Sequence, residues 1–175
     1  MSARLGREGE GYALLIRSVA KSRISAAAQG IGFATGAYQA TVRYAADRGL
    51  LSSGRRDAQD IQFRLAELRS SIFAGHSMLR MVCDLADASQ LEPITEVSMA
   101  KLHCTSLGVA VAAACVELLG ADGDRVEVGA ERRLRDAKIT EIYDGTNQVQ
   151  CMLIARDIRL SAGPEVRGGP ACASE

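Results

Sequence analysis

Apolar residues recur every three to four positions over residues 22–48, which predicts a long amphipathic helix. Its apolar positions are Ile24, Ala27, Ala28, Ile31, Ala34, Tyr38, Val42 and Ala45. An apolar cluster just before it, at residues 12–21, predicts a separate short helix. Gly30, Gly32 and Gly36 lie inside the long helix, where each costs about 1 kcal/mol relative to alanine. Their presence indicates that another helix, or a ligand, approaches closely there, and close helix packing is the favoured explanation.

Similar periodicity continues downstream. The further expected elements are, in chain order, a long helix capped by Asp57 and reaching about Ala86, a long helix from about Pro93 to Leu119, a glycine stop at residues 120–123, a loop with a short helix within residues 124–138, and a last helix from Thr146 to about Leu160. No segment alternates apolar and polar residues as a strand does. The sequence therefore predicts an all-α fold, an up-down four-helix bundle with short additional helices.

The two ends of the chain differ in composition from its middle. Residues 1–11 are rich in glycine and charge, and we expect a flexible N-terminal segment there. Residues 161–175 combine glycine, proline, serine and charge, which is typical of a disordered tail. Residues 12–160 are then expected to form one helical-bundle domain.

Composition favours packed helices and argues against several partners. Hydrophobic residues make up 47% of the chain and aromatic residues only 4%, which suits closely packed helices. The 21 basic and 21 acidic side chains cancel, so nothing favours nucleic acid or a membrane surface as a partner. Charges punctuate every apolar segment, and no membrane-spanning run is expected. The odd number of cysteines, 5, favours reduced thiols and a cytoplasmic location.

Metal and cysteine chemistry have little support. His76 and His103 are isolated, and no Cys-x-x-Cys or His-x-x-x-His spacing occurs, so no metal site is expected. Cys104 follows His103 directly, but adjacent helical residues point apart and cannot form a nucleophile and base pair.

A tight turn at residues 143–145 (Tyr-Asp-Gly) is the best candidate for a functional site. Gly145 permits a positive φ, and Thr146 is a good N-cap for the helix that follows. Asp144 would then lie at a partly buried corner beside a helix N-terminus, where a reactive carboxylate could act as a general base. A carboxylate on a turn is more commonly a solvated surface group, so these residues alone name no reaction.

Two motifs resemble those of the acyl-CoA dehydrogenase family, in its C-terminal helical domain. Residues 135–139 read Arg-Asp-Ala-Lys-Ile, and residues 143–150 read Tyr-Asp-Gly-Thr-Asn-Gln-Val-Gln, where the family has Tyr-Glu-Gly-Thr-x-Gln-x-Gln. An apolar helix with Ala155-Arg156 follows, as in the family. The similarity continues upstream and covers about residues 8–160.

This resemblance implies a flavoenzyme that removes hydrogen from the α and β carbons of an acyl thioester. Family members hold FAD between a middle β-domain and this helical bundle, and they assemble through the bundles as dimers or tetramers. A carboxylate takes the α-proton while hydride passes to the flavin, and an electron-transfer acceptor can then reoxidise it. By position, Asp144 would be the base, its backbone N–H would hold the thioester oxygen, and Arg23 and Gly145 would lie on the substrate side.

The resemblance also implies a set of FAD-contacting positions. Arg48 and Gln59 match positions that reach the diphosphate and adenine end across a subunit interface, and Gly120 matches a segment that passes the adenine half. The other matching positions are Glu117, Thr146 and Gln148.

Several positions depart from the family pattern. Asp144 replaces the usual Glu and is one methylene shorter, which withdraws its oxygens by about 1.5 Å. A misplacement of about 1 Å can cost on the order of 100-fold in rate. Ser22 occupies the position at which some branches carry an alternative base. The remaining departures lie at cofactor positions, namely Leu51, Ser52, Glu117 and Ala121.

The sequence leaves more than one function open. The N-terminal helical and middle β-domains of the family have no counterpart in these residues, so activity of this chain alone is not expected. One hypothesis is the C-terminal part of an FAD-dependent acyl-CoA dehydrogenase, either a fragment or a split subunit with a partner chain. The alternative is a catalytically degenerate bundle that serves as an oligomerisation or scaffold subunit. Retained Arg48, Gln59, Thr146 and Gln148 favour the first, and Leu51, Glu117, Ala121 and Asp144 favour the second.

Overall fold

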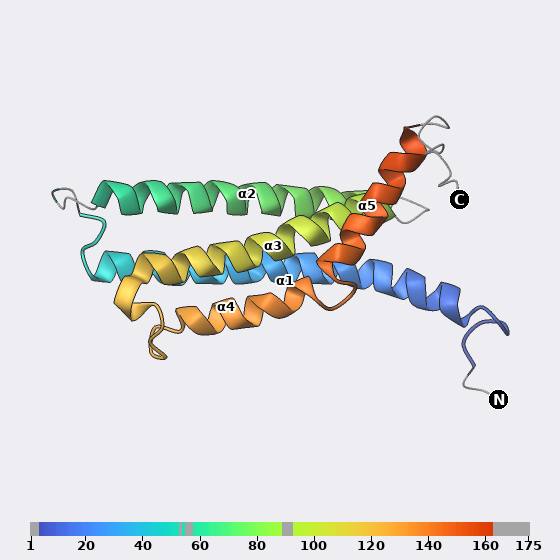
Figure 1. Ribbon diagram of the computed structural model, residues 1–175, viewed down its shortest axis with the longest axis horizontal. Coiled ribbons are helices and arrows are strands. Elements are labelled where there is room, and N and C mark those ends of the chain that lie inside the picture. Colours follow the sequence, from blue (N-terminus) through green and yellow to red (C-terminus); the bar gives the residue numbers. More distant parts are fainter. Residues whose placement is uncertain (1–3, 53, 55–57, 89–92, 163–175) are drawn as a thin grey trace, which may run out of the picture.

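The computed structural model describes residues 4–52, 54, 58–88 and 93–162, and the regular structure in these residues is helical. The elements are α1 (Gly11–Asp47), α2 (Ala58–Ala88), α3 (Ile94–Leu119), the 3₁₀ turn η1 (Gly120–Asp122), α4 (Ala130–Lys138), the 3₁₀ turn η2 (Ile139–Glu141) and α5 (Asn147–Ser161). Helices α1 to α4 run alternately up and down beside one another, and α5 stands at an angle to them (Figure 1). The predicted all-α up-down bundle with short additional helices is confirmed.

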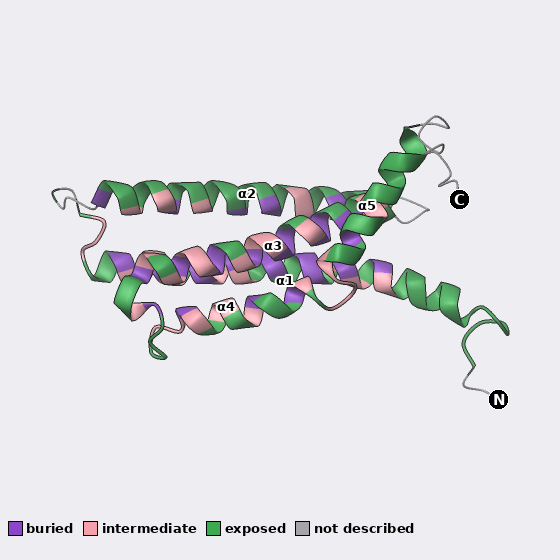
Figure 2. Cartoon of the chain, in the orientation of Figure 1, coloured by how far each residue is buried: buried purple, intermediate pink, exposed green. Residues whose placement is uncertain are grey.

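Helix α1 is longer than the sequence pattern indicated. The expected separate helix at residues 12–21 is wrong, because α1 continues without a break from Gly11 to Asp47. Ser22, at the expected junction, hydrogen-bonds to the carbonyl of Val19 at 2.9 Å instead of ending the helix. The N-terminal turns of α1 project beyond the bundle and are exposed (Figure 2).

Some sequence expectations lie outside the described residues. These are the capping role of Asp57, residues 1–3 of the expected flexible segment, and residues 163–175 of the expected tail.

Helix α3 lies at the centre of the fold and packs against α1, α2, α4 and α5. Residues from all along it are buried, among them Val97, Cys104, Val111 and Cys115. By length and composition alone, Ile94–Asp122 could cross a membrane, so the expectation that no segment reaches that length is wrong. The buried core helix of a helical bundle meets the same criterion, because it too is apolar on most sides.

Helices α1 and α3 approach each other closely at two glycines, Gly30 and Gly108. A Cβ added at Gly30 would lie 2.5 Å from the carbonyl oxygen of Cys104, and one added at Gly108 would lie 2.6 Å from the carbonyl oxygen of Gly30. Gly30 therefore has the close helix contact that the sequence predicted. Gly32 and Gly36 do not, because nothing lies within 4 Å of the Cβ that either would carry. Extending the prediction to these two glycines was wrong, since they point away from α3.

The glycine stop after α3 is confirmed. Gly120 has φ 56°, a conformation in which glycine is favoured, and the chain turns there into η1. Gly129, at φ 67°, then precedes α4. These turns return the chain along α1 and α3 and bring the motif at residues 143–150 to the opposite end of the bundle.

Candidate functional site

The turn that carries Asp144 has two consecutive residues in the left-handed region. Asp144 has φ 55° and Gly145 has φ 91°, and Asp144 is the one non-glycine residue with positive φ among the described residues. Asp and Asn tolerate this region better than most side chains, and glycine has no Cβ to clash. Thr146 then caps α5, because its Oγ1 accepts a hydrogen bond from the backbone N–H of Val149 at 3.3 Å. The predicted turn and cap are both confirmed.

Gln150 locks the turn from the side of α5. Its side chain is fully buried, and Nε2 donates to the carbonyl oxygen of Gly145 at 2.9 Å. A Cβ at Gly145 would lie 2.9 Å from that same Nε2. Any larger residue at position 145 would therefore both strain the backbone and displace Gln150.

Asn147 ties the first turn of α5 to the core of the bundle. Its Oδ1 accepts hydrogen bonds from Lys101 Nζ at 2.8 Å and from Thr105 Oγ1 at 3.1 Å. Its Nδ2 donates to Ser106 Oγ at 3.0 Å. The side chains of Lys101 and Thr105 are fully buried in α3, so the contact fixes α5 to the central helix of the fold.

Lys101 places a cation beneath the turn. Burial lowers the pKa of its ammonium group, and the nearby carboxylates of Glu141 and Asp144 act in the opposite direction. Sequence reasoning missed Lys101 and Asn147. One signal was present: Lys101 lies four residues after Val97 and four before Thr105, on the buried face of an apolar helix.

Tyr143 attaches the other side of the turn to α1. Its hydroxyl donates to Gln29 Oε1 at 2.6 Å. Burial raises the pKa of this phenol, and the charge of Asp144 raises it further. The turn is thus held by α1, α3 and α5 together, and the side chain of Asp144 is half-buried between them.

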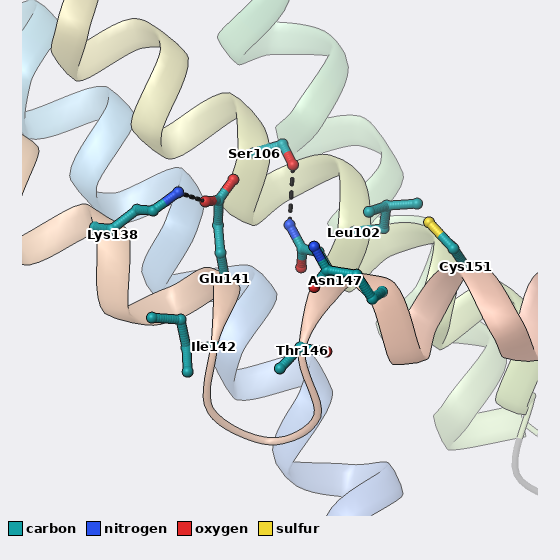
Figure 3. A pocket seen from close by; sticks show the side chains of 9 residues that line it. Leu102, Ser106, Lys138, Glu141, Ile142, Thr146, Asn147 and Cys151 are labelled. Atoms are coloured by element: carbon teal, nitrogen blue, oxygen red, sulfur yellow. Dashed lines mark hydrogen bonds and ion pairs between the residues drawn. The ribbon is translucent and has the colours of Figure 1, made fainter.

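Two of the predicted cofactor residues line a hollow of about 500 Å³ beside the turn (Figure 3). These are Thr146 and Gln148, and their neighbours in the wall are Ser106, Lys138 and Glu141. Lys138 forms an ion pair with Glu141 across the wall. Polar donors and acceptors from four elements, α3, α4, η2 and α5, therefore face one open space, as a binding site for a polar ligand requires.

Arg23, predicted on the substrate side, lies on a second hollow near the start of α5. This hollow has a volume of about 520 Å³ and is formed by the N-terminal half of α1, the start of α3, and α5. Apolar side chains such as Ile16, Val149 and Leu153 make much of its wall, and Arg23, Arg156 and Asp157 supply charge. Arg23 itself is 93% buried, so its guanidinium lies within the protein instead of on its surface.

The other predicted cofactor residues lie at the far end of the bundle. Arg48 follows the last turn of α1, and Gln59 is exposed in the first turn of α2. From Gln29, beside the turn, to Arg48 is 19 residues of α1, about 28 Å at the rise of an α-helix. The exposed Gly120 follows α3, and Glu117 lies in its last turn. The structure therefore divides the predicted set into two groups, one at each end.

Glu117 is not an isolated negative charge. Its carboxylate forms an ion pair with Arg64 of α2 at 3.1 Å, and both side chains are largely exposed. The sequence could not show this pair, because the two residues are far apart along the chain.

Metal ligands are not clustered in the part of the chain that the structure describes. No group of three or more His, Cys, Asp or Glu side chains there could hold a metal ion. His103 is exposed while Cys104 is fully buried, and burial raises the pKa of the Cys104 thiol to about 11. These two side chains do not form a nucleophile and base pair.

Comparison with known proteins identifies related sequences over nearly the whole chain. Residues 9–159 match the family model described as "Acyl-CoA dehydrogenase, C-terminal domain". The chain is 35% identical over 154 residues to a probable short/branched chain specific acyl-CoA dehydrogenase of Dictyostelium discoideum, covering 88% of this chain and 37% of that protein. It is 34% identical over 152 residues to the cyclohex-1-ene-1-carbonyl-CoA dehydrogenase of Geobacter metallireducens, covering 87% of this chain and 40% of the relative.

The chain is also similar to a solved structure over most of its length. The butyryl-CoA dehydrogenase of Megasphaera elsdenii superposes with a TM-score of 0.81 at 29% identity, over 89% of this chain and 40% of that one. The chain thus spans about two-fifths of the length of these relatives.

Proposed function

Because the chain belongs to the acyl-CoA dehydrogenase family and corresponds to its C-terminal domain, we propose that it forms the C-terminal part of an FAD-dependent enzyme that dehydrogenates an acyl thioester. In this enzyme, Asp144 removes the α-proton of the substrate as the β-hydrogen leaves as hydride. The single observation that carries the proposal is the Asp144–Gly145 turn, in which both residues have positive φ.

The turn supports this role because it is held rigidly from three sides. Tyr143 bonds to α1, Asn147 bonds to α3, and Gln150 bonds back to the carbonyl of Gly145. A general base needs such fixed support, because proton transfer depends on a heavy-atom distance of about 3 Å. Asp144 itself lies half-buried at the tip of this supported turn.

The substrate side of the site is proposed to lie toward Arg23. The hollow on which Arg23 lies combines an apolar wall with two arginines and an aspartate, which suits an acyl chain attached to a polar thioester. Short acyl chains are the first candidates, because the relative from Dictyostelium discoideum is named for short and branched chains. Arg23 would bind and orient the substrate from the wall of this hollow.

Residues for FAD are present in both groups of the predicted set. Thr146 and Gln148 line a polar hollow beside the turn, and the guanidinium of Arg48 is exposed at the far end. FAD, when bound, supplies the acceptor for the hydride. The two groups lie at opposite ends of the bundle, because Gln29, which bonds to the turn, and Arg48 are about 28 Å apart along α1. We propose that the two groups serve one cofactor by coming from different copies of the bundle.

This division supports a homo-oligomer in which each cofactor site is shared. The domains that complete the site would come from the rest of a longer chain or from a partner chain, since this chain spans about two-fifths of its relatives. An electron-transfer acceptor would reoxidise the assembled enzyme. We propose a cytoplasmic location, on the evidence of the odd number of cysteines in the sequence.

A second candidate is a degenerate bundle that serves in assembly. The observation that favours it is the exposed apolar surface of α2, where Phe63 and Phe73 are 60% and 74% exposed. Large exposed aromatic side chains commonly mark protein contacts. This candidate predicts a stable oligomer with no flavin.

The test is to purify the chain with and without a chain from the same genome that carries the missing N-terminal and β-domains. The proposal predicts a yellow complex whose flavin absorbance bleaches when a short-chain acyl-CoA is added under anaerobic conditions. A colourless oligomer in every combination would contradict the enzyme and favour the degenerate bundle.

A further inference from the structure

Three side chains of the far end surround one carboxylate. Asp122, in η1, accepts a hydrogen bond from the hydroxyl of Tyr44. Its other oxygen lies 3.1 Å from Nη1 of Arg125, and the oxygen shared with Tyr44 lies 3.7 Å from Nη1 of Arg48. The guanidinium of Arg48 also stacks on the Tyr44 ring, 4.9 Å from its centroid.

The arrangement is that of an anion site already filled from within the chain. Two guanidinium groups and a phenol converge on one point, and this is the donor set that binds phosphate in many proteins. The anion at that point is the carboxylate of Asp122, which carries a single charge. Arg125 has a second acidic neighbour, because its Nε lies 3.5 Å from Glu127.

The site is accessible to a ligand. The side chains of Arg48 and Arg125 are 57% and 54% exposed, and that of Asp122 is 27% exposed. The arginines can therefore turn toward solvent without disturbing the core. Asp122 is the last residue of the 3₁₀ turn η1 (Gly120–Asp122). Its carboxylate therefore stays close to the two arginines even when it does not contact them.

We propose that Tyr44, Arg48 and Arg125 form a diphosphate-binding site, and that Asp122 occupies it as a tethered internal competitor. A diphosphate carries more charge than a carboxylate and has oxygens for both guanidinium groups, so it can displace Asp122. The displaced carboxylate stays nearby and repels the ligand, which weakens binding. The affinity of the site for a diphosphate therefore depends on where the side chain of Asp122 lies.

The identity of the natural ligand rests on the proposed function, in which Arg48 serves the diphosphate of FAD. The existence of the diphosphate-binding site does not depend on the proposed function, because inorganic pyrophosphate is sufficient to fill it. The two proposals can therefore fail separately: one is tested by flavin reduction in the assembled enzyme, and the other by pyrophosphate binding to this chain alone.

The experiment titrates the chain with inorganic pyrophosphate at low ionic strength and follows binding by calorimetry. We expect Asp122→Asn to bind pyrophosphate about tenfold or more tightly than the unchanged chain, because the substitution removes the competing charge and keeps the shape. Adding Arg48→Gln to Asp122→Asn should abolish the gain. Circular dichroism verifies that each variant keeps the helical fold.

Two controls separate the site from a general charge effect. Asp124→Asn removes the same charge from an exposed residue two positions away, and it should leave the affinity for pyrophosphate within about twofold of the unchanged chain. Riboflavin, which has no phosphate, should bind no better to Asp122→Asn than to the unchanged chain. Equal gains from Asp122→Asn and Asp124→Asn, a gain for riboflavin, or unchanged pyrophosphate affinity in Asp122→Asn would each overturn the proposal.

Discussion

Asn147 is the residue through which the core of the bundle holds the candidate base. Its Oδ1 is the acceptor for the ammonium of Lys101, which is fully buried. A buried charge that loses a hydrogen-bonding partner destabilises the folded state strongly, whereas removing the charge together with its partner costs less. The losses of stability caused by substituting Lys101 and Asn147 should therefore be strongly coupled.

Asn147→Ala is expected to lower the free energy of unfolding by about 2–3 kcal/mol, because Lys101 loses its acceptor at 2.8 Å. The measurement is urea denaturation of the chain. In the double variant Lys101→Met with Asn147→Ala, the total loss should be smaller than the sum of the two single losses. Strictly additive losses would show that the two side chains do not depend on each other.

At the residue scale, the sequence predicted the turn but not its supports. Gly145 and Thr146 were predictable because a positive φ and an N-cap each require particular residue types. Lys101 was not recognised, because a lysine in a helix is usually exposed and only its spacing relative to Val97 and Thr105 indicated burial. The contact of Tyr143 with Gln29 joins residues 114 positions apart, and no local pattern reports such a contact.

At the scale of elements, the crossing of α1 and α3 depends on a pair of glycines. Gly30 and Gly108 leave no room for a side chain, whereas Gly32 has open space on the outer face of α1. Successive helical positions differ by about 100°, so residues two apart point in nearly opposite directions. The sequence places three glycines within residues 22–48, and the neighbouring helix decides which of them is needed.

The pair Gly30→Ala and Gly32→Ala tests this difference between two identical residues in one helix. Gly30→Ala should lower the free energy of unfolding by about 2 kcal/mol or more, because its Cβ would meet the backbone of Cys104. Gly32→Ala should raise it by about 0.5–1 kcal/mol, because alanine favours the helix and nothing lies in its way. Thermal or urea denaturation measures both. The same sign of change in both variants would contradict the described crossing.

Element boundaries were predictable where a residue type forces them. Gly120 ends α3 in a positive-φ conformation, and Thr146 begins α5 with a side-chain cap. The expected break near residue 22 was wrong because Ser22 has no such effect, and its hydroxyl bonds to the preceding turn of the same helix.

At the scale of the whole molecule, the candidate site is divided between the two ends of the bundle. Family motifs predicted which residues belong to the set, but their distribution depends on how the long helices run. The end with Asp144 has the candidate base, a capped helix and two hollows. At the end with Arg48, two of the acidic side chains already have basic neighbours: Glu117 pairs with Arg64, and Asp122 with Arg48 and Arg125. The proposed oligomer with a shared site would account for this division.

The most direct test of the account is the rate of flavin reduction by acyl-CoA in the assembled enzyme, measured by anaerobic stopped-flow absorbance for variants of Asp144. Asp144→Asn should slow reduction on the order of 100-fold or more while flavin stays bound, because the base is lost and the shape is kept. Asp144→Glu should speed reduction, because the longer side chain reaches the position that the family's usual base occupies. Reduction of the Asp144→Asn enzyme at the rate of the unchanged enzyme would contradict the assignment of Asp144 as the base.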